Sequence, residues 1–124
     1  MGWKLTYNKH KNIRSYVDGY DFASKKEAKR YAELKLLEKG KVISNLIVHP
    51  AFILSINNTH ICNYIADFSY IENGKEVIED VKGYKKGGAY QLFRLKKKLM
   101  YAIYVIDILE LWIINLVQKK PNVK

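Results

Sequence analysis

The sequence of 124 residues is poor in cysteine and in acidic residues. Its single cysteine, Cys62, excludes a disulfide within the chain, and with only three histidines beside it a closed Cys/His zinc site is not expected. Asp and Glu number 12 against 22 Lys and Arg, which gives a formal net charge of +10. This excess favours a polyanionic partner, because clustered Lys and Arg release counterions from phosphates on binding. Nucleic acid is therefore the first expected partner, and an anionic membrane surface the second.

Long apolar segments are also scarce. The first residues contain no apolar stretch of the kind found in secretory signals, so no signal is expected. Residues 99–117 form a long apolar run, but Asp107 and Glu110 lie near its middle, where charges are unfavourable in a bilayer. A helix end followed by a buried strand is the better interpretation. We expect a soluble cytoplasmic protein that does not span a membrane.

What is present fits one folded domain. Hydrophobic residues make up 48% of the chain and aromatic residues 13%, which is enough for a single core at this length. No repeat, low-complexity tract or linker interrupts it. We expect one domain over residues 17–118, preceded by a basic arm over 1–16 and followed by a polar tail over 119–124. The arm contains no acid, and its charges either bind a partner or only solubilise a frayed terminus.

The clearest predicted helix lies between Ser24 and Gly40. Ser24 is a suitable N-cap, Glu27 three residues later completes a capping-box pattern, and Gly40 is a suitable stop. Tyr31 and Leu34 lie four and seven residues after Glu27, so all three share one face of the helix. The outer side is expected to carry the charged residues Lys25, Lys26, Lys29, Arg30 and Glu33.

Four strands and a second helix are predicted after this helix. The strands are expected at 42–56, 63–71, 76–81 and 105–113, and the second helix at 91–104. Pro50 indicates a bend or an edge position in the first strand. Asn73-Gly74 joins the second strand to the third, and this dipeptide is the strongest short-range hairpin signal available. The expected order is helix, three strands, helix, strand.

The predicted hairpin brings two carboxylates together. A two-residue turn at Asn73-Gly74 sets Asp67 opposite Asp80. Opposed side chains have Cβ atoms about 4.5–5.5 Å apart, and two carboxylates at that distance repel by roughly 3 kcal/mol at an effective dielectric near 20. A divalent cation between them would remove this repulsion, and Mg²⁺ is commonly held by one or two carboxylates with waters and phosphate oxygens. Lys82, two residues after Asp80, points to the same face.

The alternative for this acid pair is a solvated sheet face on which the repulsion is screened. Ile65 and Ile78 share the face of the two acids and favour a face that is partly covered. The three neighbouring glutamates need no metal to explain them. Glu72 and Glu76 flank the turn, and Glu79 points to the other face, where a solvated or rim position is expected.

These residues resemble the PD-(D/E)xK nuclease superfamily, whose restriction-endonuclease-like fold includes archaeal and phage Holliday-junction resolvases. That family has the order αβββαβ, with an acid on the first helix, an Asp on the second strand and (D/E)-x-K on the third. The matching elements here are Glu27, Asp67 and Asp80-Val81-Lys82. The residue before Asp67 is Ala66 rather than the family's Pro, which is the most variable part of the pattern.

The likeness covers residues 17–111 and is closest to a small phage-encoded family of presumed endonucleases. It implies an α/β (α+β) domain with a restriction-endonuclease-like core, in which a central mixed sheet is flanked by helices. If the sequence is phage-encoded, the cytoplasm in question is that of the host cell.

The resemblance also implies Mg²⁺-dependent hydrolysis of a DNA phosphodiester bond, with Mn²⁺ able to substitute for Mg²⁺. Asp67, Asp80 and the backbone carbonyl of Val81 would bind the metal, and Lys82 would orient or help deprotonate the attacking water. Glu27 would complete the site as a metal or water ligand, or it is only a helix cap. Gln91, at the predicted start of the second helix, is a candidate polar residue behind the site, or simply a helix start.

DNA contacts are expected from basic residues around this site. The candidates are Lys4, Lys9, Lys11, Arg14, Lys85, Lys86, Arg94 and Lys97. They suit phosphates better than bases, and a solvated loop or helix face is the alternative for several of them.

The implied substrate is branched DNA, a four-way junction in phage or prophage recombination. Symmetrical cutting of two strands needs two active sites, so a homodimer is expected, with the apolar residues 111–117 as a contact surface. The alternatives are a nicking, repair or restriction-type nuclease of the same fold, and a noncatalytic DNA-binding protein.

Overall fold

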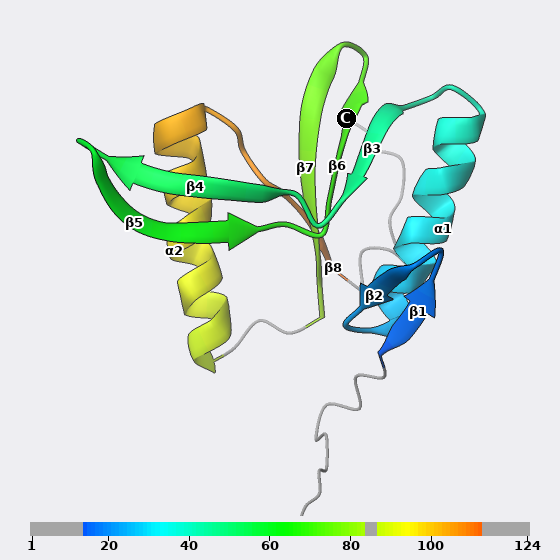
Figure 1. Ribbon diagram of the computed structural model, residues 1–124, viewed down its shortest axis with the longest axis horizontal. Coiled ribbons are helices and arrows are strands. Elements are labelled where there is room, and N and C mark those ends of the chain that lie inside the picture. The colour runs from blue at the N-terminus through cyan, green and yellow to red at the C-terminus, as the bar shows by residue number, and fades with distance from the viewer. Residues whose placement is uncertain (1–13, 84–86, 113–124) are drawn as a thin grey trace, which may run out of the picture.

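The structure is a computed structural model that describes residues 14–83 and 87–112 (Figure 1). This part of the chain forms two helices and eight strands. The helices are α1 (Lys25–Lys39) and α2 (Gly87–Tyr104). The strands are β1 (Ser15–Val17), β2 (Tyr20–Phe22), β3 (Ser44–Val48), β4 (Ala51–Ile56), β5 (Thr59–Ile65), β6 (Phe68–Glu72), β7 (Lys75–Lys82) and β8 (Leu109–Trp112).

A mixed sheet of four strands, in the order β3-β6-β7-β8, forms the centre of the molecule. Strands β3, β6 and β7 are antiparallel neighbours, and β8 lies parallel to β7. The hairpin register of β6 and β7 is the predicted one, from Glu72 opposite Lys75 to Phe68 opposite Glu79. Both turn residues have positive φ, 54° at Asn73 and 78° at Gly74, as a tight hairpin turn requires.

The two helices cover opposite faces of this sheet (Figure 1). Alternation along β7 separates the two sides, because Val77 and Val81 pack with the α1 core while Ile78 packs with the α2 core. The α1 core is built from Phe22, Tyr31, Leu34, Ile43, Phe68 and Tyr70. The α2 core is built from Leu54, Tyr64, Ala66, Ile78, Phe93, Met100 and Ile108. The expected α+β domain with a central mixed sheet and flanking helices is therefore confirmed.

Helix α1 has the predicted ends. The Ser24 hydroxyl accepts a hydrogen bond from the Glu27 N–H at 3.2 Å, and the Gly40 N–H donates to the Leu36 carbonyl at 2.9 Å. Tyr31 and Leu34 are buried, as their spacing predicts. The prediction that Arg30 lies on the outer side is wrong, because its side chain is only 16% exposed and contacts the sheet.

Two further hairpins were not predicted. β1 and β2 are three residues each, too short to display an alternating pattern, and Ser15 and Tyr16 of the predicted arm belong to β1. β4 and β5 pair as a two-stranded sheet around Asn57 and Asn58, which have φ of 50° and 64°. The predicted strand 63–71 is consequently two strands, β5 and β6, divided at Ala66 and Asp67.

Other element boundaries differ in ways that affect the site. The bend at Pro50 is confirmed, since it separates β3 from β4. Helix α2 begins at Gly87, four residues before the predicted start at residue 91, so Gln91 does not open it. The last strand begins at Leu109, later than the predicted start at residue 105. Neither described helix is long and apolar enough to cross a membrane.

Candidate active site

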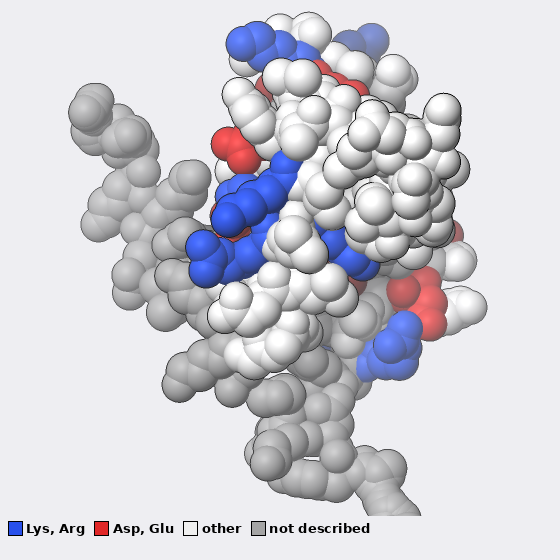
Figure 2. Space-filling model, turned by 90° about the vertical axis from the view of Figure 1, so that its left-hand side faces the viewer, with Lys and Arg blue, Asp and Glu red and all other residues white. Residues whose placement is uncertain are grey.

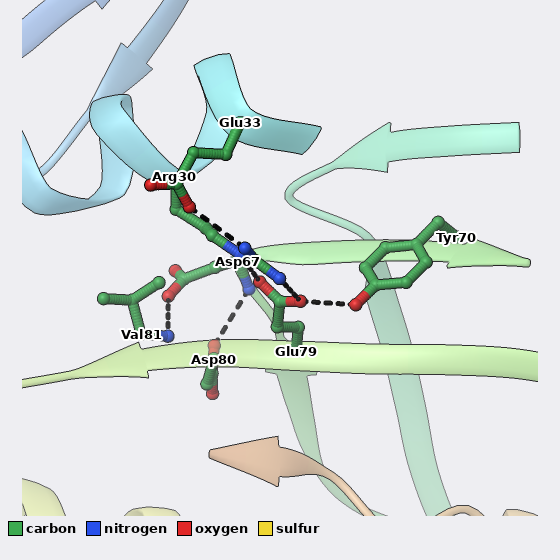
Figure 3. A network of polar contacts seen from close by, with 7 residues as sticks. All are labelled: Arg30, Glu33, Asp67, Tyr70, Glu79, Asp80 and Val81. Atoms are coloured by element: carbon green, nitrogen blue, oxygen red, sulfur yellow. Dashed lines mark hydrogen bonds and ion pairs between the residues drawn. The ribbon is translucent and has the colours of Figure 1, made fainter. Parts of the chain in front are cut away.

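Asp67 and Asp80 lie side by side, and hydrogen bonds from backbone N–H groups to their carboxylates connect the two segments that carry them. Asp67 stands just before β6, and its backbone N–H donates to Asp80 Oδ1 at 2.9 Å (Figure 3). The Val81 N–H donates in return to Asp67 Oδ2 at 2.7 Å. The two carboxylates therefore meet as the hairpin register predicts, and reciprocal backbone hydrogen bonds hold them there.

Tyr64 and Lys82 fix the second oxygen of Asp80. The Tyr64 hydroxyl donates to Asp80 Oδ2 at 2.5 Å in a buried contact, and Lys82 Nζ lies 3.5 Å from the same oxygen. Lys82 Nζ also lies 3.6 Å from the ring centroid of Phe93 on α2, a cation–π distance. The sequence did not indicate Tyr64 or Phe93 as site residues. Tyr64 lies only three positions before Asp67 in the sequence. The β4–β5 hairpin that directs it toward β7 was not predicted, so its contact with Asp80 was not expected.

One cavity of about 400 Å³ contains all four predicted catalytic residues. Glu27 reaches it from α1, Asp67 from the start of β6, and Asp80 and Lys82 from β7. Its other lining residues come from β5, β7 and α2, and they are Asn63, Tyr64, Ile65, Val81, Ala89, Leu92, Phe93 and Lys96. Lys96 is part of this lining, whereas its neighbour Lys97 is not.

Glu27 caps the start of α1 and also lines the cavity. Its Oε1 accepts the Ala23 N–H at 3.4 Å, which caps the helix start, and its side chain also lines the cavity. Burial raises the pKa of Glu27, and the negative charge of Asp80 raises it further. The cap and the site are therefore not exclusive, because the first turn of α1 lies against the carboxylates.

Three acidic side chains, Glu27, Asp67 and Asp80, line the cavity with two lysines. Burial, followed by the charges of Asp80 and Glu27, raises the pKa of Asp67 from 3.8 to about 8, although the Val81 hydrogen bond and Lys82 act in the opposite direction. Without a bound cation, burial and the neighbouring carboxylates therefore favour the protonated form of Asp67. A site that disfavours its own ionised form in this way is one that a cation would relieve.

The residues fit a hard divalent cation. The groups available at the acid pair are carboxylate and carbonyl oxygens, which are the ligands that Mg²⁺ prefers. Asp67 and Asp80, with Val81 beside them in the cavity lining, form a small donor set of the kind that leaves room for water and phosphate oxygens. Among the described residues, no three His, Cys, Asp or Glu side chains converge as a complete metal cage. Glu27 is therefore better assigned to the wall of the cavity than to a third direct ligand.

A buried ion pair lies on the other face of β7, directly behind Asp80. Glu79 is 0% exposed, and its carboxylate accepts Arg30 Nε–H at 2.7 Å and Arg30 Nη2–H at 2.9 Å (Figure 3). The Tyr70 hydroxyl donates to Glu79 Oε2, and Arg30 Nη1–H donates to Glu33 Oε1 at 3.0 Å. The predicted solvated or rim position of Glu79 is wrong. The alternation of side chains along β7 correctly placed Glu79 on the face opposite Asp80, but α1 covers that face.

The other predicted site residues that the structure describes do not line the cavity. Gln91 is exposed and does not line it. Arg14 pairs with Asp21 at 3.0 Å in the β1–β2 hairpin, and Lys97 pairs with Glu110 at 2.6 Å, so neither is a free cation. Arg94 lines a separate cavity on another side of α2. The remaining candidates lie outside the described residues, and they are Lys4, Lys9, Lys11, Lys85 and Lys86.

The prediction that Ile65 and Ile78 lie on a partly covered face is correct for Ile78 only. Ile78 is completely buried against α2, whereas Ile65 is 62% exposed at the end of β5. Ile65 belongs to the β4–β5 hairpin and not to the central sheet, so the alternation that was carried across Ala66 did not apply to it.

The fold and the cavity define a class: a small α+β protein whose mixed sheet presents paired aspartates and a lysine in one pocket. Residues 6–120 match the model of a family described as "Protein of unknown function (DUF1064)", and the chain belongs to that family. Neither the curated proteins nor the solved structures contain a significant match.

Proposed function

We propose that this protein is a Mg²⁺-dependent DNA endonuclease with its active site at Glu27, Asp67, Asp80 and Lys82. The observation that carries the proposal is one cavity in which the Asp67 N–H donates to the Asp80 carboxylate, the Val81 N–H donates to the Asp67 carboxylate, and Lys82 stands 3.5 Å from Asp80. Paired carboxylates with an adjacent lysine suit phosphodiester hydrolysis, because that reaction needs both a cation and a positive group near the phosphate.

The arrangement of elements supports the same proposal. Without the two short hairpins, the described elements follow the order α1, β3, β6, β7, α2, β8. Asp67 stands at the start of β6, and Asp80 and Lys82 stand in β7. This order and these positions are what the resemblance to the PD-(D/E)xK superfamily implies, so we extend the proposal to a restriction-endonuclease-like fold.

Asp67, Asp80 and the Val81 carbonyl would hold Mg²⁺. The ion would supply charge stabilisation at the phosphate and a more acidic water. Lys82 would donate hydrogen bonds to the phosphate or to the attacking water, and the Phe93 ring and Asp80 hold its ammonium group in place for this role. Glu27 would orient water at the wall of the cavity. Mn²⁺ is expected to substitute for Mg²⁺, because it accepts the same oxygen ligands.

The charge of the molecule supports DNA as the substrate. Figure 2 looks onto the side formed by α2 and the β4–β5 hairpin, where blue side chains gather in the middle of the face beside a broad uncharged surface. A net charge of +10 favours phosphate binding of this kind. We propose branched DNA, a four-way junction in phage recombination, as the substrate. We also propose a homodimer, since two symmetrical cuts need two sites.

The decisive experiment compares cleavage of a four-way junction, a flap and a linear duplex in Mg²⁺. Asp80→Asn and Lys82→Ala are each expected to lower the cleavage rate at least about 100-fold, the usual loss for a group that stabilises transition-state charge. Glu76→Gln and Lys75→Ala are matched controls, because both residues are exposed at the far end of the same strand β7. They should cut as the wild type does.

Two outcomes would reject the nuclease. If the wild type binds junctions but cuts no substrate in Mg²⁺ or Mn²⁺, the noncatalytic DNA-binding protein is the correct interpretation. If Asp80→Asn and Lys82→Ala both cut normally, the acid pair is not the active site. Loss of cutting with junction affinity retained is the expected result. A wild type that cuts nicked or linear DNA as well as junctions would point to a repair or restriction-type enzyme.

A further inference from the structure

Two exposed aliphatic side chains flank the acidic cavity. Ile65, at the end of β5, is 62% exposed, and Leu92, in the second turn of α2, is 51% exposed, yet both line the cavity that holds Asp67 and Asp80. They come from different elements, so the cavity mouth has an apolar residue on the hairpin and another on the helix. We call these two residues the apolar rim.

The apolar rim does not suit contact with a phosphate backbone. Phosphates are met by the charged part of the cavity, where Lys82 and Lys96 both point in, and Lys96 has no ion-pair partner in the described part of the chain. Aliphatic side chains exposed beside such a site gain free energy against a base or sugar face that is itself apolar. Base faces become available only where a nucleotide is unstacked, and Ile and Leu are among the side chains that proteins insert at such steps.

We propose that the apolar rim packs against a nucleobase that is unstacked next to the scissile phosphate. The substrate class is then DNA with an unpaired or unstacked nucleotide at the cut, as at a branch point, and uninterrupted duplex is disfavoured. This inference rests on the proposed nuclease function, and it assigns Ile65 and Leu92 as residues that determine substrate specificity.

The position of the rim favours DNA over a protein partner. A second protein seated on Ile65 and Leu92 would close the mouth of the cavity that the phosphate must enter. The rim also continues directly into the charged lining, so one ligand with an apolar and an anionic part fits both. A nucleotide has that combination.

The test compares rim variants with matched exposed residues on the same elements. The variants are Ile65→Ser, Leu92→Ser and the pair together. The controls are Ile61→Ser in β5 and Leu95→Ser in α2, at residues that are 47% and 53% exposed and do not line the cavity. Because all four side chains are exposed, thermal melting should show that every variant folds.

Two readings are taken. The first is the ratio of the cleavage rate on a four-way junction to that on a linear duplex of the same sequence. The second is the fluorescence of 2-aminopurine at the branch when the Asp80→Asn protein binds, which reports unstacking without cleavage. The double rim variant should lower the ratio about tenfold, close to the low end of what burying one aliphatic side chain contributes, and should lose the fluorescence rise. The controls should change neither.

The outcomes separate the two proposals. If the wild type cuts junctions but the rim variants keep the full ratio and fluorescence, the rim inference is overturned and the nuclease stands. If nothing is cut but the fluorescence rise depends on the rim, the nuclease fails and the rim inference survives as a binding site. Equal losses in the control variants would also reject the proposed role of the apolar rim. A change from dimer to monomer on Ile65→Ser, measured by light scattering, would reject it too, because Ile65 would then be a contact between protein chains.

Discussion

The hydroxyl of Tyr64 is the group that, at the residue scale, ties the β4–β5 hairpin to the site. It donates to Asp80 Oδ2 from a residue 16 positions earlier in the chain, and the contact is buried. A buried carboxylate oxygen that loses such a donor keeps its desolvation penalty without compensation. Tyr64 therefore positions Asp80 and is not itself proposed to touch the substrate.

Replacing Tyr64 with Phe should weaken the site without changing its shape. We expect a loss of about 1.5–3 kcal/mol of unfolding free energy, the usual range for a hydrogen bond to a charged group, together with weaker Mg²⁺ binding. Urea unfolding and titration calorimetry measure the two effects. Tyr101→Phe is the control, because its side chain is exposed and has no hydrogen bond within the described residues. An unchanged Mg²⁺ affinity would argue against a positioning role for the hydroxyl.

The protonation of Asp67 predicts how stability changes with pH. Its pKa is about 8 in the folded metal-free protein and 3.8 in the absence of the fold, so between these values the folded state binds more protons than the unfolded state. Unfolding free energy should therefore fall as the pH rises through this window, by up to about 1.4 kcal/mol per pH unit.

Asp67→Asn should flatten this pH dependence, since the asparagine does not titrate. Urea unfolding at several pH values between 5 and 8, with a chelator present, makes the comparison. Glu76→Gln, an exposed acid on the same hairpin, should keep the wild-type slope. Stability that rises with pH over this range in the wild type would contradict the raised pKa.

At the element scale, the Arg30–Glu79 ion pair joins α1 to β7. Arg30 stands one turn after Glu27, and Glu79 stands next to Asp80, so the pair sets the helix that carries one site acid against the strand that carries another. Glu79 has no exposed surface, and its carboxylate is satisfied by Arg30 and Tyr70. Removing one partner would leave a buried charge unpaired.

Arg30→Met should therefore lower the unfolding free energy by about 3–5 kcal/mol. The double variant Arg30→Met with Glu79→Leu should recover much of that loss, because no charge is left buried. Urea unfolding of the two variants checks both statements. Arg14→Met is the matched control, since the Arg14–Asp21 pair is exposed and its loss should have little effect. If Arg30→Met were as mild as the control, the pair would not be what holds α1 to the sheet.

At the scale of the whole molecule, a net charge of +10 makes binding to DNA dependent on salt. Two adjacent lysines of α2 should contribute differently to it. Lys96 points into the candidate active site without an acidic partner in the described residues, whereas Lys97 is held by Glu110 at 2.6 Å. Only a free cation can exchange its counterions for a phosphate.

Lys96→Ala should lower the slope of log affinity against log salt by about one, the value for one phosphate contact. Lys97→Ala should leave the slope close to that of the wild type. Fluorescence anisotropy of a labelled junction between 50 and 200 mM salt, roughly the range over which such contacts respond, measures both in an Asp80→Asn background. Equal slopes for the two variants would mean that the Glu110 ion pair opens when DNA binds.

The sequence by itself determined the features that depend on near neighbours. The capping of α1, its Tyr31–Leu34 face and the turn at Asn73-Gly74 follow from short-range rules. The last of these also determined that Asp67 meets Asp80, because a two-residue turn leaves a single register. The Asn57-Asn58 turn had a comparable signal, but the strands on either side of it were merged into longer predicted segments.

Only the tertiary structure decided which side of each element is covered. Arg30 and Glu79 are 49 residues apart, so no local pattern could show that each buries the charge of the other. The contact of Tyr64 with Asp80 depends on where the β4–β5 hairpin lies against the sheet. The position of α2 decides that Lys96 lines the cavity and that Lys97 pairs with Glu110. Periodicity predicts which residues share a face, but the packing of distant elements determines what covers that face.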